Sequence, residues 1–202
     1  MNNLVKITAA TGNRHFYLNS PTAKLLLRYL LLVGGVVSGS TERGGAICIG
    51  DAGGELNLFY TITSNNRAPA GGGIYAGNKT RVNISNSYVV NNTAANGGGG
   101  MYLQSSDANI IHSNFRGNVA GNKGGGIFMV NSVTNIYGSE ISSNYGRRYG
   151  GGMRIEHRRM VMQDTTISNN KADYEGGGLF VNDCPIYVEL KRCIIKNNQV
   201  NK

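Results

Sequence analysis

Acidic and histidine side chains are the residues that could act as general acid and base or hold a metal ion. Asp51 and Asp183 occupy equivalent positions of a repeated pattern described below, but they belong to opposite ends of it. Other acidic residues fall at positions that do not coincide and form no stacked pair, as in Glu140, Asp164 and Glu189. The three histidines lack the spacing of a metal site or a catalytic triad: His15, His112 and His157. The sequence therefore indicates no catalytic residues, no metal and no cofactor, and it favours a protein that is not an enzyme.

A series of aromatic residues is the first candidate binding feature. Tyr75, Tyr102 and Phe128 each follow an apolar residue at the end of a glycine phrase, and Arg154 holds the next equivalent position. If equivalent residues stack about 4.8 Å apart, these side chains form an exposed stripe on the outside of the protein. Such a stripe could bind sugar rings or a protein surface, with Arg154 adding a cation–π contact. Stacked aromatic side chains could equally serve only to stabilise neighbouring strands.

A group of basic residues is the second candidate. The group consists of Arg147, Arg148, Arg154, His157, Arg158 and Arg159. The chain has a formal net charge of +9, from 20 Lys and Arg against 11 Asp and Glu. We expect a glycine turn to bring this group to one edge, where it could bind phosphate, an acidic glycan, another anionic surface or an acidic protein. Solvated loop charges would need no such partner, and no nucleic-acid-binding motif accompanies them.

A glycine phrase followed by an apolar residue recurs along the chain and would position these candidates. Its apolar residues are Ile47, Ile74, Met101, Ile127, Met153 and Leu179, at steps of 27, 27, 26, 26 and 26 residues. A period this regular over most of a chain is typical of a repeat protein whose units stack on one another. Glycine suits a sharp turn because it adopts positive φ without a Cβ clash.

A second landmark, an apolar residue followed three positions later by asparagine, recurs with the same period. The asparagines predicted to stack are Asn65, Asn92, Asn118, Asn144, Asn170 and Asn198. We interpret them as a structural ladder of side-chain amides, since a single ligand site would need the residue only once. Alternating apolar residues between the landmarks, such as Val82 and Ile84, predict strands with one buried face. The sequence thus predicts an all-β parallel β-helix of about six to seven coils with three short strands each.

The first residues fit this pattern less well. Residues 1–24 are predicted to be an N-terminal cap or degenerate coil, and residues 25–202 the repeat domain. Leu25–Val37 is too short for a membrane span and is interrupted by Arg28, which also argues against a signal peptide. We interpret it as a first coil with Val37 as the apolar landmark and Ser40 in the asparagine position. The three cysteines form no pattern typical of disulfides or zinc, and we expect them to be buried or half-buried.

The last coil should leave strand edges and apolar residues open between Ile186 and Ile195. We expect a partner chain, another copy or a further segment to cover them. Sedimentation of the isolated chain tests this, since a stable monomer at high concentration would rule out an obligatory partner.

Two phrases carry a resemblance to known families. Gly44-Gly45-Ala46-Ile47 and Phe115-Arg116-Gly117-Asn118 resemble the GGAI and FxxN repeats of chlamydial polymorphic outer membrane proteins. More broadly, the pattern resembles the right-handed parallel β-helices of pectate-lyase-like proteins and bacterial surface adhesins. The resemblance implies a right-handed helix, a surface or secreted location and a role in adhesion. We therefore expect an adhesin-like structural and binding module for a protein or glycan. The alternatives are an accessory subunit of a larger assembly and a degenerate polysaccharide lyase or hydrolase.

Overall fold

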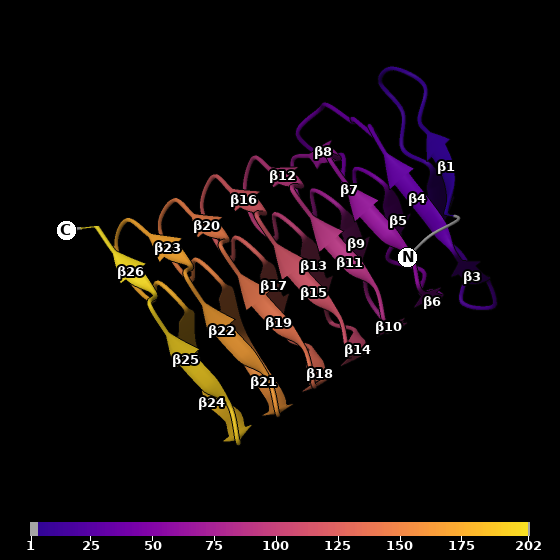
Figure 1. Cartoon of the computed structure of the whole chain (residues 1–202). Coiled ribbons are helices and arrows are strands. Elements are labelled where there is room, and N and C mark those ends of the chain that lie inside the picture. Colours follow the sequence, from indigo (N-terminus) through magenta and orange to yellow (C-terminus); the bar gives the residue numbers. More distant parts are fainter. Residues whose placement is uncertain (1–3, 202) are drawn as a thin grey trace.

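The computed structural model describes residues 4–201, and for residues 183–186 it describes the backbone alone. The described residues form a rod of stacked coils in which strands pair in parallel with their equivalents one coil away (Figure 1). No helix among these residues is long and apolar enough to cross a membrane. The predicted parallel β-helix is confirmed.

The coils form three sheets. The eight-stranded sheet contains β1 (Val5–Thr8), β4 (Leu30–Val33), β7 (Ile62–Ser64), β11 (Tyr88–Val90), β15 (Asn114–Arg116), β19 (Glu140–Ser142), β22 (Thr166–Ser168) and β25 (Ile194–Lys196). The six-stranded sheet contains β8 (Arg67–Ala68), β12 (Thr93–Ala94), β16 (Val119–Ala120), β20 (Tyr145–Gly146), β23 (Lys171–Ala172) and β26 (Gln199–Val200). These two-residue strands add a short fourth segment to the three predicted for each coil.

The twelve-stranded sheet consists of two rows. One row contains β2 (Phe16–Leu18), β5 (Ile47–Ile49), β9 (Ile74–Ala76), β13 (Met101–Gln104) and β17 (Ile127–Val130). The other contains β3 (Lys24–Arg28), β6 (Gly54–Phe59), β10 (Thr80–Ser85), β14 (Asp107–Ile111) and β18 (Val133–Tyr137). The long strands β21 (Met153–Gln163) and β24 (Leu179–Lys191) join the rows because each continues around the corner between them.

Apolar side chains from every row fill the inside of the rod. The predicted inward positions are buried in the central coils, as Val82, Ile84, Ile110 and Met160 illustrate. Each buried Ile, Leu or Met contributes on the order of 1.5–3 kcal/mol relative to an exposed side chain. The last coil is open by comparison, since Ile195 is 49% exposed whereas its equivalent Ile167 is fully buried. The expectation that a partner covers this coil stays a prediction.

The asparagine ladder is present, with one corrected member. Each side chain donates from Nδ2 to Oδ1 of the next asparagine at 2.9–3.1 Å, through Asn66, Asn92, Asn118, Asn144, Asn170 and Asn198. The first member is Asn66, and the prediction of Asn65 was wrong by one residue. Asn65 instead occupies the left-handed corner before the ladder, at φ 54°, as Asn91 does at φ 55°. Asparagine tolerates this region better than most side chains do, so both residues of the pair have a structural role.

The first coil was placed in the wrong register. Leu32, not Val37, occupies the landmark position, because it pairs with Thr63, three residues before Asn66. The Gly35 amide donates to Asn66 Oδ1 at 2.8 Å. Gly35 therefore takes the asparagine position that was predicted for Ser40. The preceding residues 4–24 contribute β1 and β2, which pair with β4 and β5 in the continuous sheets. Cys48 is buried and Cys193 half-buried, as expected, and both are free thiols; the side chain of Cys184 lies outside the described residues.

A second buried ladder consists of hydroxyl groups, whose role the sequence did not reveal. The backbone amides of Ser87 and Ser113 donate to the hydroxyl oxygens of Ser113 and Ser139, both at 3.1 Å. Each of these hydroxyls in turn donates to a carbonyl two residues earlier. The two ladders satisfy the polar groups of successive corners and hold the coils in one register.

Candidate functional groove

The residues that follow the glycine phrases form a column on the outer face of β5, β9, β13, β17, β21 and β24. This floor column contains Cys48, Tyr75, Tyr102, Phe128, Arg154 and Phe180, paired in register from coil to coil. The Tyr75 and Tyr102 rings meet edge to face at 5.4 Å, and the Tyr102 and Phe128 rings lie 4.7 Å apart. The predicted stacking is therefore present.

The predicted exposure of this stripe was wrong. Tyr75 is fully buried, Phe128 and Arg154 are each 5% exposed, and Tyr102 is half-buried. The reason is a second column, formed by the residue directly before each glycine phrase, which lies over the floor. This rail column contains Arg43, Ala70, Gly97, Lys123, Tyr149 and Glu175. Arg43 lies over the Tyr75 ring at 4.7 Å and Lys123 over the Phe128 ring at 5.4 Å.

Small rail residues leave a gap over Tyr102. Ala70 and Gly97 line a cavity of about 310 Å³ together with Tyr102, Gln104 and Phe128. A Cβ on Gly97 would come within 2.7 Å of the Phe128 ring, so the rail position here has no room for a side chain. The half-buried state of Tyr102 thus follows from the two smallest side chains of the rail.

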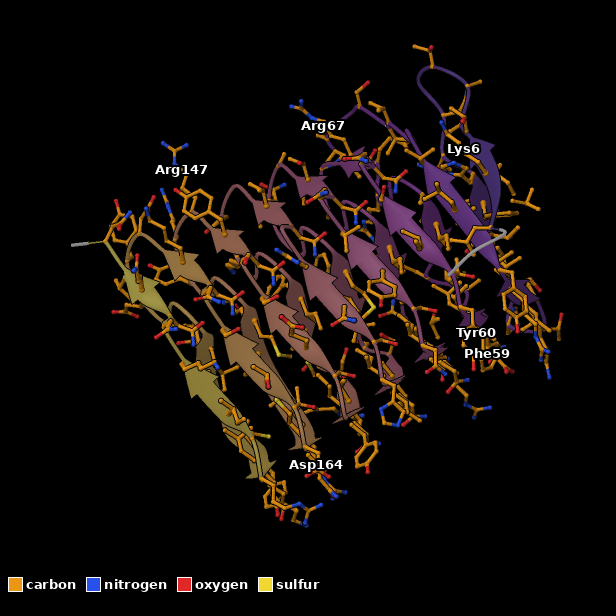
Figure 2. All side chains as sticks on the ribbon, viewed as in Figure 1. Lys6, Phe59, Tyr60, Arg67, Arg147 and Asp164 are labelled. Carbon is orange, nitrogen blue, oxygen red and sulfur yellow. The ribbon has the colours of Figure 1, made fainter. Side chains whose placement is uncertain are left out.

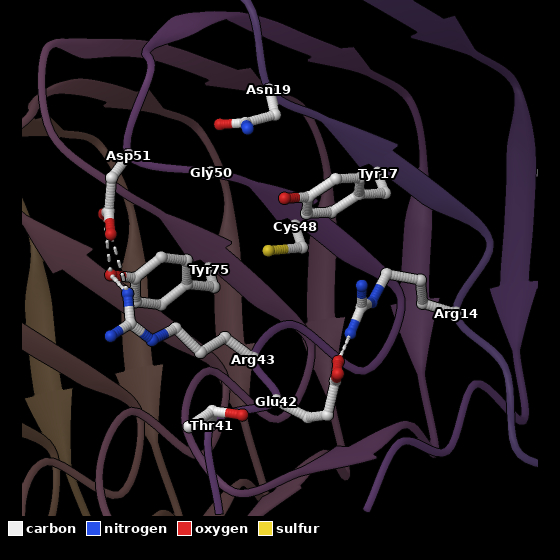
Figure 3. Close-up of a pocket in the computed structure, with 10 residues that line it drawn as sticks. All are labelled: Arg14, Tyr17, Asn19, Thr41, Glu42, Arg43, Cys48, Gly50, Asp51 and Tyr75. Carbon is white, nitrogen blue, oxygen red and sulfur yellow. Dashed lines mark hydrogen bonds and ion pairs between the residues drawn. The ribbon is translucent and has the colours of Figure 1, made fainter. Parts of the chain in front are cut away.

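A second cavity of about 440 Å³ lies beside the first, at the N-terminal coils (Figure 3). Its walls include Arg14, Tyr17, Glu42 and Asp51. Glu42 and Arg43 line both cavities, which makes the two cavities neighbours along the floor column. We call the pair of cavities the outer groove.

Ion pairs neutralise the charged side chains of the groove. Arg14 pairs with Glu42, and Arg43 Nη1 lies 3.3 Å from Asp51 Oδ2. Farther along the rod, Glu156 Oε1 accepts from Lys123 Nζ at 3.2 Å and from Arg154 Nε at 2.5 Å. The groove therefore presents donors and acceptors side by side without a large field of one sign.

Some polar atoms near the groove have no hydrogen-bond partner among the described residues. Arg14 Nε, Asn122 Oδ1 and Arg154 Nη1 are buried and unpartnered. Such atoms cost about 1–3 kcal/mol each when they are left unsatisfied. Arg154 lies between the Tyr149 and Phe180 rings, 4.8 Å from each centroid, which fixes its orientation. Unsatisfied groups of both kinds, donor and acceptor, mark positions where a polar ligand could bind.

Burial also changes the acidity of the floor residues. Removal from water raises the pKa of the Cys48 thiol to about 11, against the lowering effect of Arg14 and Arg43. Burial likewise raises the pKa of Tyr75 and of Tyr102. All three side chains therefore stay protonated at neutral pH and form an uncharged part of the groove floor.

The predicted basic edge does not exist as one cluster. Arg154 is buried in its ion pair with Glu156. Arg147 projects from the loop edge of the rod (Figure 2), where Asp173 and Tyr174 line a cavity with it. Arg159 instead lies in the second half of β21, over the Tyr187 ring at 5.5 Å. Arg148 belongs to the Arg147 loop, and His157 and Arg158 form the corner inside β21, so a whole strand segment separates the two parts.

Sequence reasoning identified the floor but missed the groove walls. Tyr17 could have been found by aligning Phe16–Leu18 with Ile47–Ile49, because this alignment places Tyr17 beside Cys48. Arg43 could have been found from its place directly before a glycine phrase. No local signal indicated Arg14 or Glu42, since both lie in the irregular first coil.

Within the part of the chain that the structure describes, no group of three His, Cys, Asp or Glu side chains could hold a metal ion. Searches of curated proteins and of solved structures found no match to the chain. The sequence matches a family described as the right-handed beta helix region over residues 44–201. This family includes enzymes related to pectate lyase as well as proteins without catalytic activity. The match covers most of the chain and coincides with the stacked coils, so the protein belongs to the right-handed β-helix family.

Proposed function

We propose that the protein is a non-catalytic binding module that holds a neutral, hydroxyl-rich glycan in the outer groove. The observation that carries this proposal is the composition of the groove, in which paired charges lie beside aromatic rings. A sugar hydroxyl both donates and accepts hydrogen bonds, and it therefore suits a site that offers carboxylates and guanidinium groups together. The apolar face of a sugar ring packs well on an aromatic side chain such as Tyr102.

The size and polarity of the cavities support a small polar ligand. Cavities of about 310 and 440 Å³ lie in the range of small-molecule sites. Asn122 lines the smaller cavity and Arg14 the larger one, and their unpartnered Oδ1 acceptor and Nε donor become available to ligand hydroxyls when these side chains turn toward the cavity. Binding would satisfy these atoms, which adds a favourable contribution that an empty groove lacks.

An acidic glycan fits the groove less well than a neutral one. Recognition of repeated carboxylate or sulfate groups needs unpaired cations. The groove cations Arg14, Arg43 and Lys123 already have carboxylate partners. The net positive charge of the chain is therefore spread over other surfaces, and the basic group expected to bind anions is divided.

A binding role is favoured over hydrolysis by the same ion pairs. Glycoside hydrolysis commonly needs two neighbouring carboxyl groups, one of which carries a proton for the leaving group. Glu42 and Asp51 each pair with an arginine and not with one another, and both belong to the wall of the groove. The proposal thus assigns these side chains to binding.

Isothermal titration calorimetry with defined neutral and acidic oligosaccharides tests the proposal. We expect binding to neutral members of the set, weakened about 2- to 12-fold by Tyr102→Ala, the range for a lost aromatic contact. Tyr88→Ala is the matched control, because Tyr88 is 38% exposed on the eight-stranded sheet, away from the floor column. Selective binding to acidic oligosaccharides, or equal effects of the two variants, would contradict the proposal.

A further inference from the structure

Arg43 lies between the two cavities of the outer groove and covers the floor at that point. Its guanidinium lies over the Tyr75 ring at 4.7 Å, and Nη1 donates to the Tyr75 hydroxyl at 2.5 Å. The same Nη1 lies 3.3 Å from Asp51 Oδ2 (Figure 3). Tyr75 is fully buried in this arrangement, although its side chain belongs to the outer face of the rod.

The Tyr75 ring is held by contacts that do not involve Arg43. Its hydroxyl donates to Gln104 Oε1 at 2.8 Å, and its ring meets the edge of Tyr102. Its backbone belongs to β9, which pairs with a coil on each side. Arg43, by contrast, follows an irregular segment, and its side chain is 37% exposed. The guanidinium is therefore the part of this contact that can move while the ring stays in place.

Tyr102, one coil away from Tyr75, shows how a tyrosine at the same position behaves when no guanidinium covers its ring. The rail residues above it, Ala70 and Gly97, are too small to lie over the ring, and Tyr102 lines an open cavity. Tyr75 has the same residue type and the same position in its coil. The difference in exposure between the two tyrosines thus results from Arg43.

We propose that Tyr75 is a covered sugar-binding subsite that opens when a bound glycan displaces the Arg43 guanidinium from the ring. The sugar ring then takes the place of the guanidinium on the aromatic face, and the two cavities become one continuous site. Asp51, beside the ring, remains available as an ion-pair partner for the displaced guanidinium. This inference rests on the proposed function, since it assigns a third contact point to the same glycan.

Chemical nitration of tyrosine, followed by peptide mapping with mass spectrometry, measures the cover directly. In the intact protein we expect nitration of Tyr75 to be slow. Arg43→Ala should raise the nitration rate of Tyr75 about 2- to 30-fold, the range for a lost cation–π contact. Arg159→Ala is the matched control, because Arg159 lies over the Tyr187 ring at 5.5 Å in the second half of β21, away from the outer groove. The control should leave the Tyr75 rate unchanged. Far-UV circular dichroism and the unfolding midpoint establish that each variant is folded.

The same variants separate the subsite from the proposed function. A saturating neutral oligosaccharide should protect Tyr75 from nitration in folded Arg43→Ala. If Tyr75 in this folded variant reacts no faster than in the parent protein, the cover does not exist and the inference is wrong. If Tyr75 reacts faster but a ligand that binds gives no protection, Tyr75 is not a subsite. If no glycan binds to any form while Arg43→Ala still exposes Tyr75, the proposed function fails and the assigned ligand fails with it.

Discussion

Removal of one side-chain amide from the buried asparagine ladder should destabilise the protein far more than removal of one side-chain amide from a row of exposed asparagines on the outer face of the rod. Asn118 is fully buried, and its Oδ1 accepts from the Asn92 amide at 3.0 Å and from Asn92 Nδ2 at 3.1 Å. Its Nδ2 donates to the Val89 carbonyl at 2.8 Å and to Asn144 Oδ1 at 3.1 Å. Asn118→Ala therefore removes these bonds and leaves buried polar groups behind.

The magnitude follows from the number and the burial of the lost bonds. At about 1 kcal/mol for each bond, with an added cost for groups left unsatisfied, Asn118→Ala should lower the free energy of unfolding by about 3–5 kcal/mol. Asn109 provides the matched control, since its Nδ2 donates to Asn83 Oδ1 at 3.2 Å and its Oδ1 accepts from Asn135 at 3.1 Å. This outer asparagine ladder, formed by Asn83, Asn109 and Asn135, lies on the outside of the rod, where water can replace its bonds. Asn109→Ala should cost about 1 kcal/mol or less.

Urea unfolding followed by far-UV circular dichroism compares the two variants. The dependence of the free energy on urea must be checked for each, because stacked coils interact mainly with their neighbours and can unfold in parts. A loss in Asn118→Ala no greater than that in Asn109→Ala would refute the reasoning. The coils would then owe their register to apolar packing alone.

Further predictions concern the groove and the first coil. Ala70→Arg should place a guanidinium over Tyr102, as Arg43 lies over Tyr75, and calorimetry should show weaker glycan binding without loss of stability; unchanged binding would count against the groove. Cys48 should react with iodoacetamide far more slowly than Cys193 at pH 8, because a thiol with a pKa of about 11 is ionised in only about one molecule in a thousand. Equal rates by peptide mapping would show that Cys48 is accessible. Burial lowers the pKa of His15, so the unfolded chain binds its proton more readily and stability should fall as the pH drops below about 6.5. The urea midpoint of His15→Gln should decline less over this range, and parallel declines would contradict the assignment.

The period of the sequence was enough to predict the coils, because equivalent residues recur at nearly constant steps. It was not enough where two candidates for one position lie side by side. Asn65 and Asn66 differ by one residue, and only the pairing of Asn66 with Asn92 distinguishes the ladder from the corner. The first coil also departs from the period, since Gly35 and Asn66 are 31 residues apart and Gly35 lacks a side chain that could mark the position.

Burial of the aromatic floor could not be predicted from the alternation within a strand. Alternation places Tyr75 and Phe128 outside the core, and the structure agrees with that direction. Their exposure depends on the rail, and the rail contact joins Arg43 to a tyrosine in the following coil. The division of the basic group has a similar origin, since neighbours in sequence such as Arg154 and Arg159 belong to different rows of the sheet.

A crystal structure of the protein with a neutral oligosaccharide that binds in calorimetry would test the central claim most directly. We expect a sugar chain along the outer groove, with one ring packed on Tyr102 and hydroxyl groups within hydrogen-bonding distance of Asn122 Oδ1. We also expect Arg43 to have moved away from Tyr75. A bound sugar on the eight-stranded sheet beside Tyr88, with an empty groove, would contradict the account.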